Sequence, residues 1–313
     1  MYDRNQLLDT HRRFINKGWY DSTISLDKLE QWLDNFNTPN SNDNFDTKIC
    51  AKFLLDAIVF YQTNHMVAII DSIINQKKSM LNEIKEKELG GRLSETELQT
   101  EWEQYISECY IVAAAKPEDA GGSAHNAVRY WRNHTGIESG TVASLRSAVV
   151  QQHKKHIFFV DDFIGTGSKM EKFLTNELFP DKNTYGFLTI KEFMEDHHDG
   201  VDYNIAVFAL YEKGYNYLRG LFKDTNFYYG EFYDKSYDLC SEESPLYDLY
   251  EEEKAHIAAY LRAKQAELDS DNKYALNLPI AFTHGCPNNT LALYYKQVPN
   301  WADLFQETNP HHN

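Results

Sequence analysis

The stretch from residue 157 to residue 170, IFFVDDFIGTGSKM, decides how the chain folds. Its first four residues are apolar without interruption, which is typical of a strand buried in a parallel sheet. Two carboxylates, Asp161 and Asp162, follow, and then comes a turn with two glycines and two hydroxyl side chains. Met170 opens a segment with the apolar spacing of an amphipathic helix. This order predicts a ligand site at the carboxyl edge of a sheet.

The turn after the acidic pair has the composition of a phosphate-binding loop. We call it the Thr-Gly loop, and it comprises Ile164, Gly165, Thr166, Gly167 and Ser168. Glycines let the backbone approach an anion closely, and the free N–H groups of the next helical turn point toward it. The acidic pair repels phosphate, so we expect it to face sugar hydroxyls or a metal ion. The alternative is a purely structural role, in which the acidic pair ends the strand and only caps the next helix.

A second anion-binding loop is predicted upstream. Residues 109–116 (CYIVAAAK) read as a buried strand, and Lys116 at its end could neutralise a pyrophosphate. Gly121, Gly122 and Ser123 follow and could offer backbone amides at the start of the next helix. A glycine-containing loop with one lysine is also an ordinary way to enter a helix, and the sequence leaves both interpretations open.

The remaining pattern beyond residue 106 predicts an α/β fold. Apolar runs alternate with helical patterns, which favours a parallel sheet with crossover helices. We expect two further strands, an aromatic strand or loop beside the site, and a late acidic helix; these are residues 185–190 and 205–211, residues 227–238, and residues 247–268.

Residues 1–105 read as a helical region. Residues 49–61 are apolar almost all round and predict a central helix, and Ser94 with Glu97 resembles a capping box that opens another. The expected organisation is a helical region at 1–105 followed by an α/β domain at 106–313.

Composition restricts the possible classes of function. The 313 residues include 47 acidic and 31 basic side chains, for a net charge of −16, which disfavours non-specific binding to nucleic acid. The first residues lack an apolar signal region, and no apolar run is long enough to cross a membrane. The four cysteines contain no C-x-x-C pair, so free thiols in a reducing compartment are expected. We therefore expect a cytoplasmic protein.

The acidic pair with the Thr-Gly loop resembles the diphosphate-ribose signature of type I phosphoribosyltransferases. The resemblance implies a type I phosphoribosyltransferase-like core that binds phosphoribosyl pyrophosphate (PRPP) with Mg²⁺. By this resemblance, Asp161 and Asp162 bind the ribose hydroxyls and the metal ion. The Thr-Gly loop binds the 5′-phosphate, and the segment from Lys116 to Ser123 binds the pyrophosphate. Many family members carry an acid directly before Thr-Gly, and in some it acts as a general base. Here that position is Gly165.

The C-terminal part adds a second resemblance. A Pro-Asn-Asn-Thr-Leu turn at residues 287–291 and a Trp-x-x-Leu-Phe ending at residues 301–305 follow the α/β pattern. They resemble a branch of phosphoribosyltransferase-like proteins from bacterial conflict and defence gene clusters, including some retron cassettes. The resemblance implies an effector in an anti-phage system with protein partners encoded in the same operon.

The sequence leaves three hypotheses about activity. The first is an enzyme that transfers or cleaves at ribose C1′, with Asp161, Asp162 and Lys116 in the catalytic set. The second is a catalytically inactive module that senses PRPP or a nucleotide, which Gly165 favours slightly. The third is a scaffold whose sheet is a relic, and the intact acids and Thr-Gly argue against it. The acceptor substrate is not encoded in any pattern that we identify.

Overall fold

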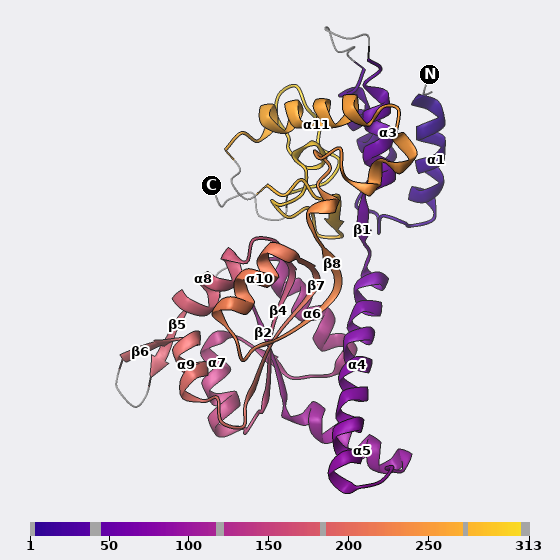
Figure 1. The fold of residues 1–313 in the computed structure, drawn as a ribbon. Coiled ribbons are helices and arrows are strands. Elements are labelled where there is room, and N and C mark those ends of the chain that lie inside the picture. Colours follow the sequence, from indigo (N-terminus) through magenta and orange to yellow (C-terminus); the bar gives the residue numbers. More distant parts are fainter. Residues whose placement is uncertain (1–3, 38–44, 117–121, 182–185, 272–274, 308–313) are drawn as a thin grey trace. The chain divides into compact units, whose positions relative to one another are not determined.

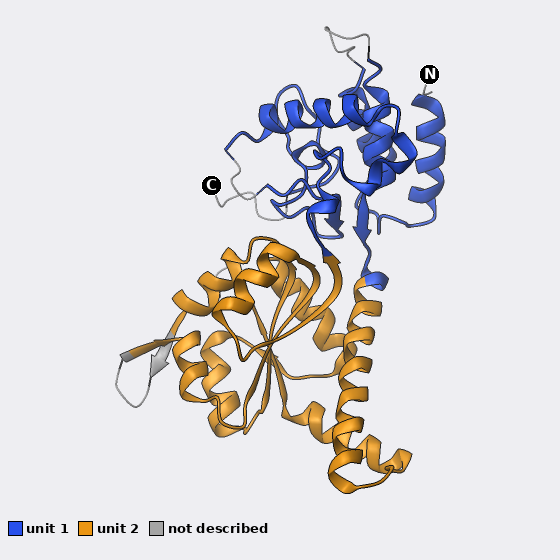
Figure 2. Cartoon of the chain, viewed as in Figure 1, with its two compact units in different colours: residues 1–65, 233–313 blue, residues 66–232 orange. Residues whose placement is uncertain are grey.

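The computed structural model describes residues 4–37, 45–116, 122–181, 186–271 and 275–307. The chain forms two compact units (Figures 1 and 2). Unit 1 comprises residues 1–65 and 233–313, and unit 2 comprises residues 66–232. Unit 2 is therefore inserted in the sequence of unit 1.

A five-stranded sheet forms the centre of unit 2, with strand order β3-β2-β4-β7-β8. Strands β3, β2, β4 and β7 run parallel to one another. The strands are β2 (Cys109–Ala113), β3 (Ser139–Gly140), β4 (His156–Ile164), β7 (Asp202–Tyr211) and β8 (Asn226–Tyr233). The α/β class with a parallel sheet is confirmed, and so is the helical character of the N-terminal region.

Helices cover both faces of this sheet, which explains why its central strands are apolar throughout. On one face, α7 (Val142–Arg146), α8 (Ser168–Asn176), α9 (Ile190–Asp196) and α10 (Glu212–Leu221) share an apolar core with β4 and β7. On the other face, Trp131 of α6 (Ser123–Thr135) packs its ring near Phe158 of β4. Because successive side chains of a strand alternate between faces, β4 presents its residues in turn to these two layers.

The rest of unit 2 consists of two long helices, a short π-helix and a hairpin. The helices are α4 (Thr63–Leu89), which begins in unit 1, and α5 (Glu95–Glu108); the π-helix is Ser147–Gln151. The capping box of Ser94 and Glu97 is present at the start of α5. Strands β5 (Leu178–Asp181) and β6 (Gly186–Thr189) pair antiparallel in a separate sheet. The strand expected at residues 185–190 thus exists, but it lies outside the central sheet.

Unit 1 is built from segments that are far apart in the sequence. Strand β1 (Val59–Tyr61) pairs in parallel with β9 (Ile280–Phe282). The indole N–H of Trp32, a residue of α2, donates to the carbonyl oxygen of Leu293 at 2.8 Å, and its side chain is fully buried. The helices are α1 (Arg4–Asn16), α2 (Leu26–Asp34), α3 (Lys48–Ala57) and α11 (Lys254–Leu268), with 3-10 turns at Lys235–Tyr237, Pro245–Tyr250 and Ala292–Tyr294.

Two expected helices are shorter than the sequence pattern suggested. The helix expected at residues 49–61 ends at Ala57, because the next residues join β1 and need an extended backbone to pair with β9. The helix expected at 247–268 begins only at Lys254, after a 3-10 turn that Pro245 opens. The compact units also do not follow the division at residue 105 expected from the sequence, since residues 66–105 belong to unit 2.

All four cysteines are buried free thiols. Among the described helices, none combines the length and the apolar composition needed to cross a membrane.

Candidate functional site

The acidic pair lies inside β4, near the carboxyl end of the central sheet. Asp161 and Asp162 are 1% and 4% exposed, and β4 continues past them to Ile164. Phe159, two residues before Asp161, contacts Phe173 of α8, so alternation directs Asp161 toward the α8 face. The Asp162 side chain lies close enough to Asp161 for the two carboxyl groups to interact. The pair therefore forms one acidic group near the end of the strand.

Asp161 is held by a lysine that sequence reasoning did not select. Lys169, the second residue of α8, places its Nζ 2.9 Å from both carboxylate oxygens of Asp161. Only Oδ1 accepts a hydrogen bond from it, and Oδ1 also accepts the N–H of Asp162 at 3.0 Å. Oδ2 is buried without a hydrogen-bond partner. The Lys169 side chain is 50% exposed, so its ammonium group can move into solvent. The Asp161 carboxylate is buried and stays in place.

The electrostatic environment disfavours the ionised form of Asp161. Burial is the largest cause and raises the pKa of Asp161 well above its ordinary value. The Lys169 ammonium lowers this pKa, and the neighbouring Asp162 carboxylate raises it again. Carboxylates with strongly perturbed pKa values cluster at functional sites, and burial of such a group costs stability unless a ligand or cation compensates it.

The Thr-Gly loop connects β4 to α8 and leaves the first turn of that helix open. Gly167 has φ +85°, in the left-handed region that favours glycine, and it occupies the N-cap position of α8. Its lack of a side chain means that no side-chain cap covers the first N–H groups of α8. Gly165 is buried, whereas Thr166 and Ser168 are partly exposed. The backbone donors predicted for a phosphate are therefore available for a ligand.

Gly214 supports this loop from α10, and the sequence analysis missed it. A Cβ built on Gly214 would lie 2.4 Å from the carbonyl oxygen of Gly165 and 2.8 Å from Cγ2 of Ile164. Side-chain atoms are essentially never so close to backbone, so only glycine permits α10 to pack against the loop here. A glycine in the first turn of a helix is the only sequence signal, and it does not distinguish close packing from chance.

The second predicted loop follows β2, the neighbour of β4. Ala113 pairs with Val160, and the N–H of Ala114 donates to the carbonyl oxygen of Val160 at 2.9 Å. The segment that leads to Lys116 thus leaves the sheet beside the acidic pair, and Lys116 is exposed. Gly122 is the N-cap of α6 and Ser123 its buried first residue, while Gly121 lies outside the described residues.

The acidic pair fits a Mg²⁺ ion that a phosphorylated ligand helps to hold. Across the described ranges, no cluster of three or more His, Cys, Asp or Glu side chains is placed to bind a metal ion. Mg²⁺ commonly takes one or two protein carboxylates and completes its shell with phosphate oxygens and water. Oδ2 of Asp161, which accepts no hydrogen bond, and the carboxylate of Asp162 are oxygen ligands of the required kind.

A protein-family model named PRTase-CE matches residues 29–307 of the sequence, which is most of the chain and includes both predicted loops. The chain belongs to the PRTase-CE family. As a PRTase-CE protein, it is phosphoribosyltransferase-like, in agreement with the resemblance carried by the acidic pair and the Thr-Gly loop. Comparison with curated proteins finds no match.

Two solved structures show limited similarity to this PRTase-CE protein. The AQ2163 protein from Aquifex aeolicus is 10% identical, with a TM-score of 0.25, over 41% of this chain and 56% of that protein. The matched region thus spans little more than half of the Aquifex protein. The xanthine-guanine-hypoxanthine phosphoribosyltransferase of Helicobacter pylori is 11% identical, with a TM-score of 0.28, over 56% of this chain and 83% of that protein. These superpositions are too loose to assign a residue or a ligand.

Proposed function

We propose that this PRTase-CE protein binds PRPP with Mg²⁺, or a related nucleotide, at the carboxyl end of β4 and transfers or cleaves at ribose C1′. One observation carries the proposal. Two buried carboxylates near the end of β4 are followed closely by a left-handed glycine turn at the start of α8, and this order brings groups that can hold hydroxyls or a metal ion near the backbone donors of the first helical turn. A ribose 5-phosphate presents vicinal hydroxyls for the carboxylates and a phosphate for the backbone donors.

Each part of the proposed site has a distinct role. Asp161 and Asp162 accept hydrogen bonds from the ribose hydroxyls, and they anchor the metal. The Thr-Gly loop holds the 5′-phosphate, and Lys116 with the N-terminus of α6 (Gly122 and Ser123) takes the pyrophosphate. When bound, Mg²⁺ neutralises charge on the departing pyrophosphate.

The proposed transfer is a substitution at C1′. The bond from C1′ to the pyrophosphate oxygen breaks, and its electron pair leaves with the pyrophosphate. A lone pair on an acceptor nitrogen, or on water in a cleavage reaction, forms the new bond to C1′, and the proton that the acceptor or the water loses passes to the departing pyrophosphate or to solvent. The protein contributes positioning and charge stabilisation, because buried carboxylates close to C1′ favour the positive charge that develops there.

A sensing module is the second candidate, and Gly165 favours it. An acid at this position, which in some relatives acts as a general base, is missing here. A protein that binds PRPP without turnover would use the same acidic pair and the same loop.

We also propose that the protein acts as an effector in a bacterial anti-phage or conflict system, such as a retron cassette, together with operon-encoded partners. The support is the resemblance of residues 287–291 and 301–305 to that branch. The double variant Asp161→Asn/Asp162→Asn tests this setting in a plaque assay of the complete gene cluster. An effector loses protection against phage, whereas unchanged protection would contradict the proposal.

Calorimetry with PRPP tests the binding function directly. The wild type, the double variant and a control with an exposed substitution, Asp199→Asn, are titrated with PRPP in the presence and absence of Mg²⁺. Wild type and control are expected to bind PRPP with Mg²⁺, and the double variant to bind at least ~100-fold more weakly, because about two charge-assisted hydrogen bonds of ~1.5–3 kcal/mol each are lost.

Pyrophosphate release with a panel of bases and nucleotides then separates the two candidates. Mg²⁺-dependent binding with release of pyrophosphate supports a transferase or hydrolase. Binding without release under every condition supports the sensor. Equal affinity of the wild type and the double variant, or no binding at all, would refute the assignment of the acidic pair.

A further inference from the structure

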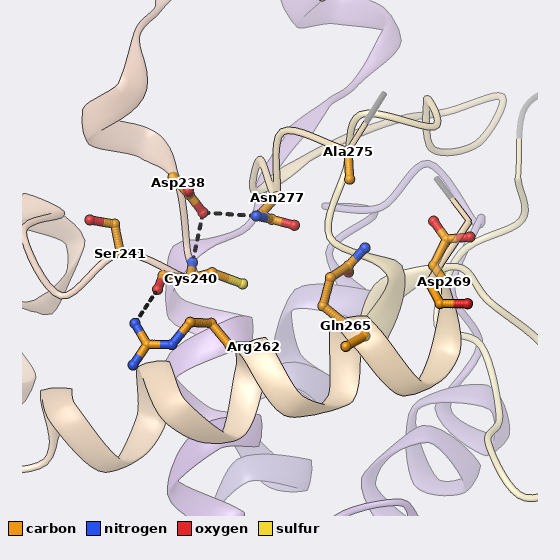
Figure 3. Close-up of a pocket in the computed structure, with 10 residues that line it drawn as sticks. Asp238, Cys240, Ser241, Arg262, Gln265, Asp269, Ala275 and Asn277 are labelled. Atoms are coloured by element: carbon orange, nitrogen blue, oxygen red, sulfur yellow. Dashed lines mark hydrogen bonds between the residues drawn. The ribbon is translucent and has the colours of Figure 1, made fainter. Parts of the chain in front are cut away.

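A pocket in unit 1 shares no residue with the candidate site at the end of β4. It has a volume of about 640 Å³ and is lined by one face of α11, by residues near Cys240, and by the segment that contains Ala275 and Asn277 (Figure 3). This volume is in the range of pockets that hold small molecules. Burial raises the pKa of the Cys240 thiol to about 12, so this side chain remains neutral and is no nucleophile.

The charged groups of the pocket are already paired within the protein. Arg262 donates to the carbonyl oxygen of Cys240 at 3.0 Å and to the Glu242 carboxylate at 3.1 Å. Asp269 pairs with Lys296 at 3.1 Å and accepts the hydroxyl of Tyr295. Asp238 accepts the backbone N–H of Cys240 at 2.8 Å and the side-chain amide of Asn277 at 3.1 Å. Each of these charged groups has a partner within the protein, so the pocket does not call for an ionic ligand.

Gln265 of α11 has an unused hydrogen-bond donor. Its Oε1 accepts the backbone N–H of Ala292 at 2.7 Å, which fixes the orientation of the amide because only the oxygen can accept. The other end, Nε2, is buried without a partner, and the residue is only 9% exposed. In Figure 3 this nitrogen points away from the helix, toward the segment of Ala275 and Asn277.

Asn277 has an unused acceptor on the opposite wall. Its Nδ2 donates to Oδ1 of Asp238 at 3.1 Å, and a carboxylate can only accept, so the orientation of this amide is fixed as well. Its Oδ1 is buried without a partner. The residue has φ +52°, and Leu239 donates its N–H to the Asn277 carbonyl oxygen at 3.1 Å, so the backbone is held in this position.

We propose that this pocket binds a small neutral molecule through a lactam edge, as found in nucleobases of the uracil or hypoxanthine type. The ligand carbonyl would accept from Nε2 of Gln265, and the adjacent ring N–H would donate to Oδ1 of Asn277. A buried polar group without a partner costs about 1–3 kcal/mol, so a ligand that satisfies both groups recovers that free energy. The site lies within unit 1, and the inference does not depend on PRPP binding.

The first test is ¹⁵N NMR of the full chain with uracil and hypoxanthine as probes. The side-chain amide signals of Gln265 and Asn277 are expected to shift with ligand concentration. The negative probe is 1,3-dimethyluracil, which keeps both carbonyls but has no ring N–H. Uridine monophosphate is titrated as a further probe. If it binds more tightly than uracil, the ligand that supplies the lactam edge is a nucleotide rather than a free base.

Variants of both amides complete the test. Gln265→Glu keeps an acceptor for the Ala292 N–H but removes the donor, and Asn277→Gly removes the acceptor while tolerating the positive φ. Each is expected to weaken uracil binding about tenfold, the loss of one hydrogen bond of ~1.4 kcal/mol. Gln6→Glu, an exposed change in α1 of the same unit, is the matched control.

Two results would overturn the proposal. The first is equal response of the two amide signals to uracil and to 1,3-dimethyluracil. The second is the absence of any shift at millimolar probe, which would mean that an ordered water alone satisfies both groups. If Gln265→Glu fails to fold, the Asn277→Gly variant and the methylated probe still decide the outcome.

Discussion

Asp161→Asn is expected to make the protein more stable and, at the same time, unable to bind Mg²⁺-PRPP. Asparagine has nearly the same volume and carries no charge, so it removes the penalty of burying a carboxylate. Lys169 loses its partner, but its half-exposed side chain can be solvated. A pKa shift of only one unit corresponds to about 1.4 kcal/mol, so we expect the melting temperature at pH 8 to rise by at least ~2–4 °C.

The stabilisation should depend on pH, and its sign follows from the raised pKa of Asp161. The folded protein retains a proton on this carboxyl at pH values where the unfolded chain, with an ordinary pKa of ~3.9, has lost it. The free energy of unfolding contributed by Asp161 therefore falls as pH rises through this window. Wild type and Asp161→Asn should differ little at pH 4 and increasingly toward pH 8.

Thermal melts of the two proteins from pH 4 to pH 8 measure this difference, with Asp199→Asn as the control for a change of net charge. Mg²⁺-PRPP should reduce the difference in melting temperature between Asp161→Asn and the wild type, because the ligand binds and stabilises only the wild type. A melting temperature of Asp161→Asn below that of the wild type at pH 8 would contradict the electrostatic account. It would mean that the ion pair with Lys169 outweighs the cost of burial.

Gly214→Ala is expected to displace the Thr-Gly loop and strongly weaken ligand binding. The added methyl group would lie 2.4 Å from the Gly165 carbonyl oxygen, and backbone on both sides must move to accommodate it. Overpacking of this kind costs about 1–3 kcal/mol. A displacement of the loop by about 1 Å is expected to weaken PRPP binding by roughly 100-fold.

The same helix provides the matched control. Gly220 of α10 is exposed, and a Cβ there meets no atom within 4 Å. Gly220→Ala should leave ligand affinity unchanged and raise stability by up to ~1 kcal/mol, because alanine is the better helix former. Urea unfolding and calorimetry of both variants distinguish the two positions. If Gly214→Ala behaved like Gly220→Ala, the close approach of α10 to the loop would not matter for either property.

The sequence was informative wherever structure depends on neighbours along the chain. The run before the acidic pair is apolar because β4 is covered on both faces, and the helix after the Thr-Gly loop begins where the glycine turn predicts. The capping box of α5 is equally local. The strand, the loop and the helix were therefore predictable from fourteen consecutive residues, whereas the acids expected after the strand lie inside β4, which continues to Ile164.

Features that depend on distant segments could not be predicted in the same way. The role of Gly214 arises from packing across about fifty residues of chain. Residues 59–61 continue the apolar pattern of the preceding helix, so the sequence predicts helix there. They form a strand because they pair with residues 280–282, which lie more than two hundred positions away and leave no local signal. Lys169 follows the motif directly, yet its contact with Asp161 depends on how α8 leaves the loop.

The nested order of the two units has a consequence for synthesis on the ribosome. Every residue of unit 2 leaves the exit tunnel before residue 233, so this unit can fold while the polypeptide is still being elongated. Residues 1–65 emerge first but must wait for residues 233–313, because β1 lacks β9 and Trp32 lacks Leu293 until then. Translation speed over residues 233–313 thus determines how long the helices of residues 1–65 remain without their core, exposed to chaperones and proteases.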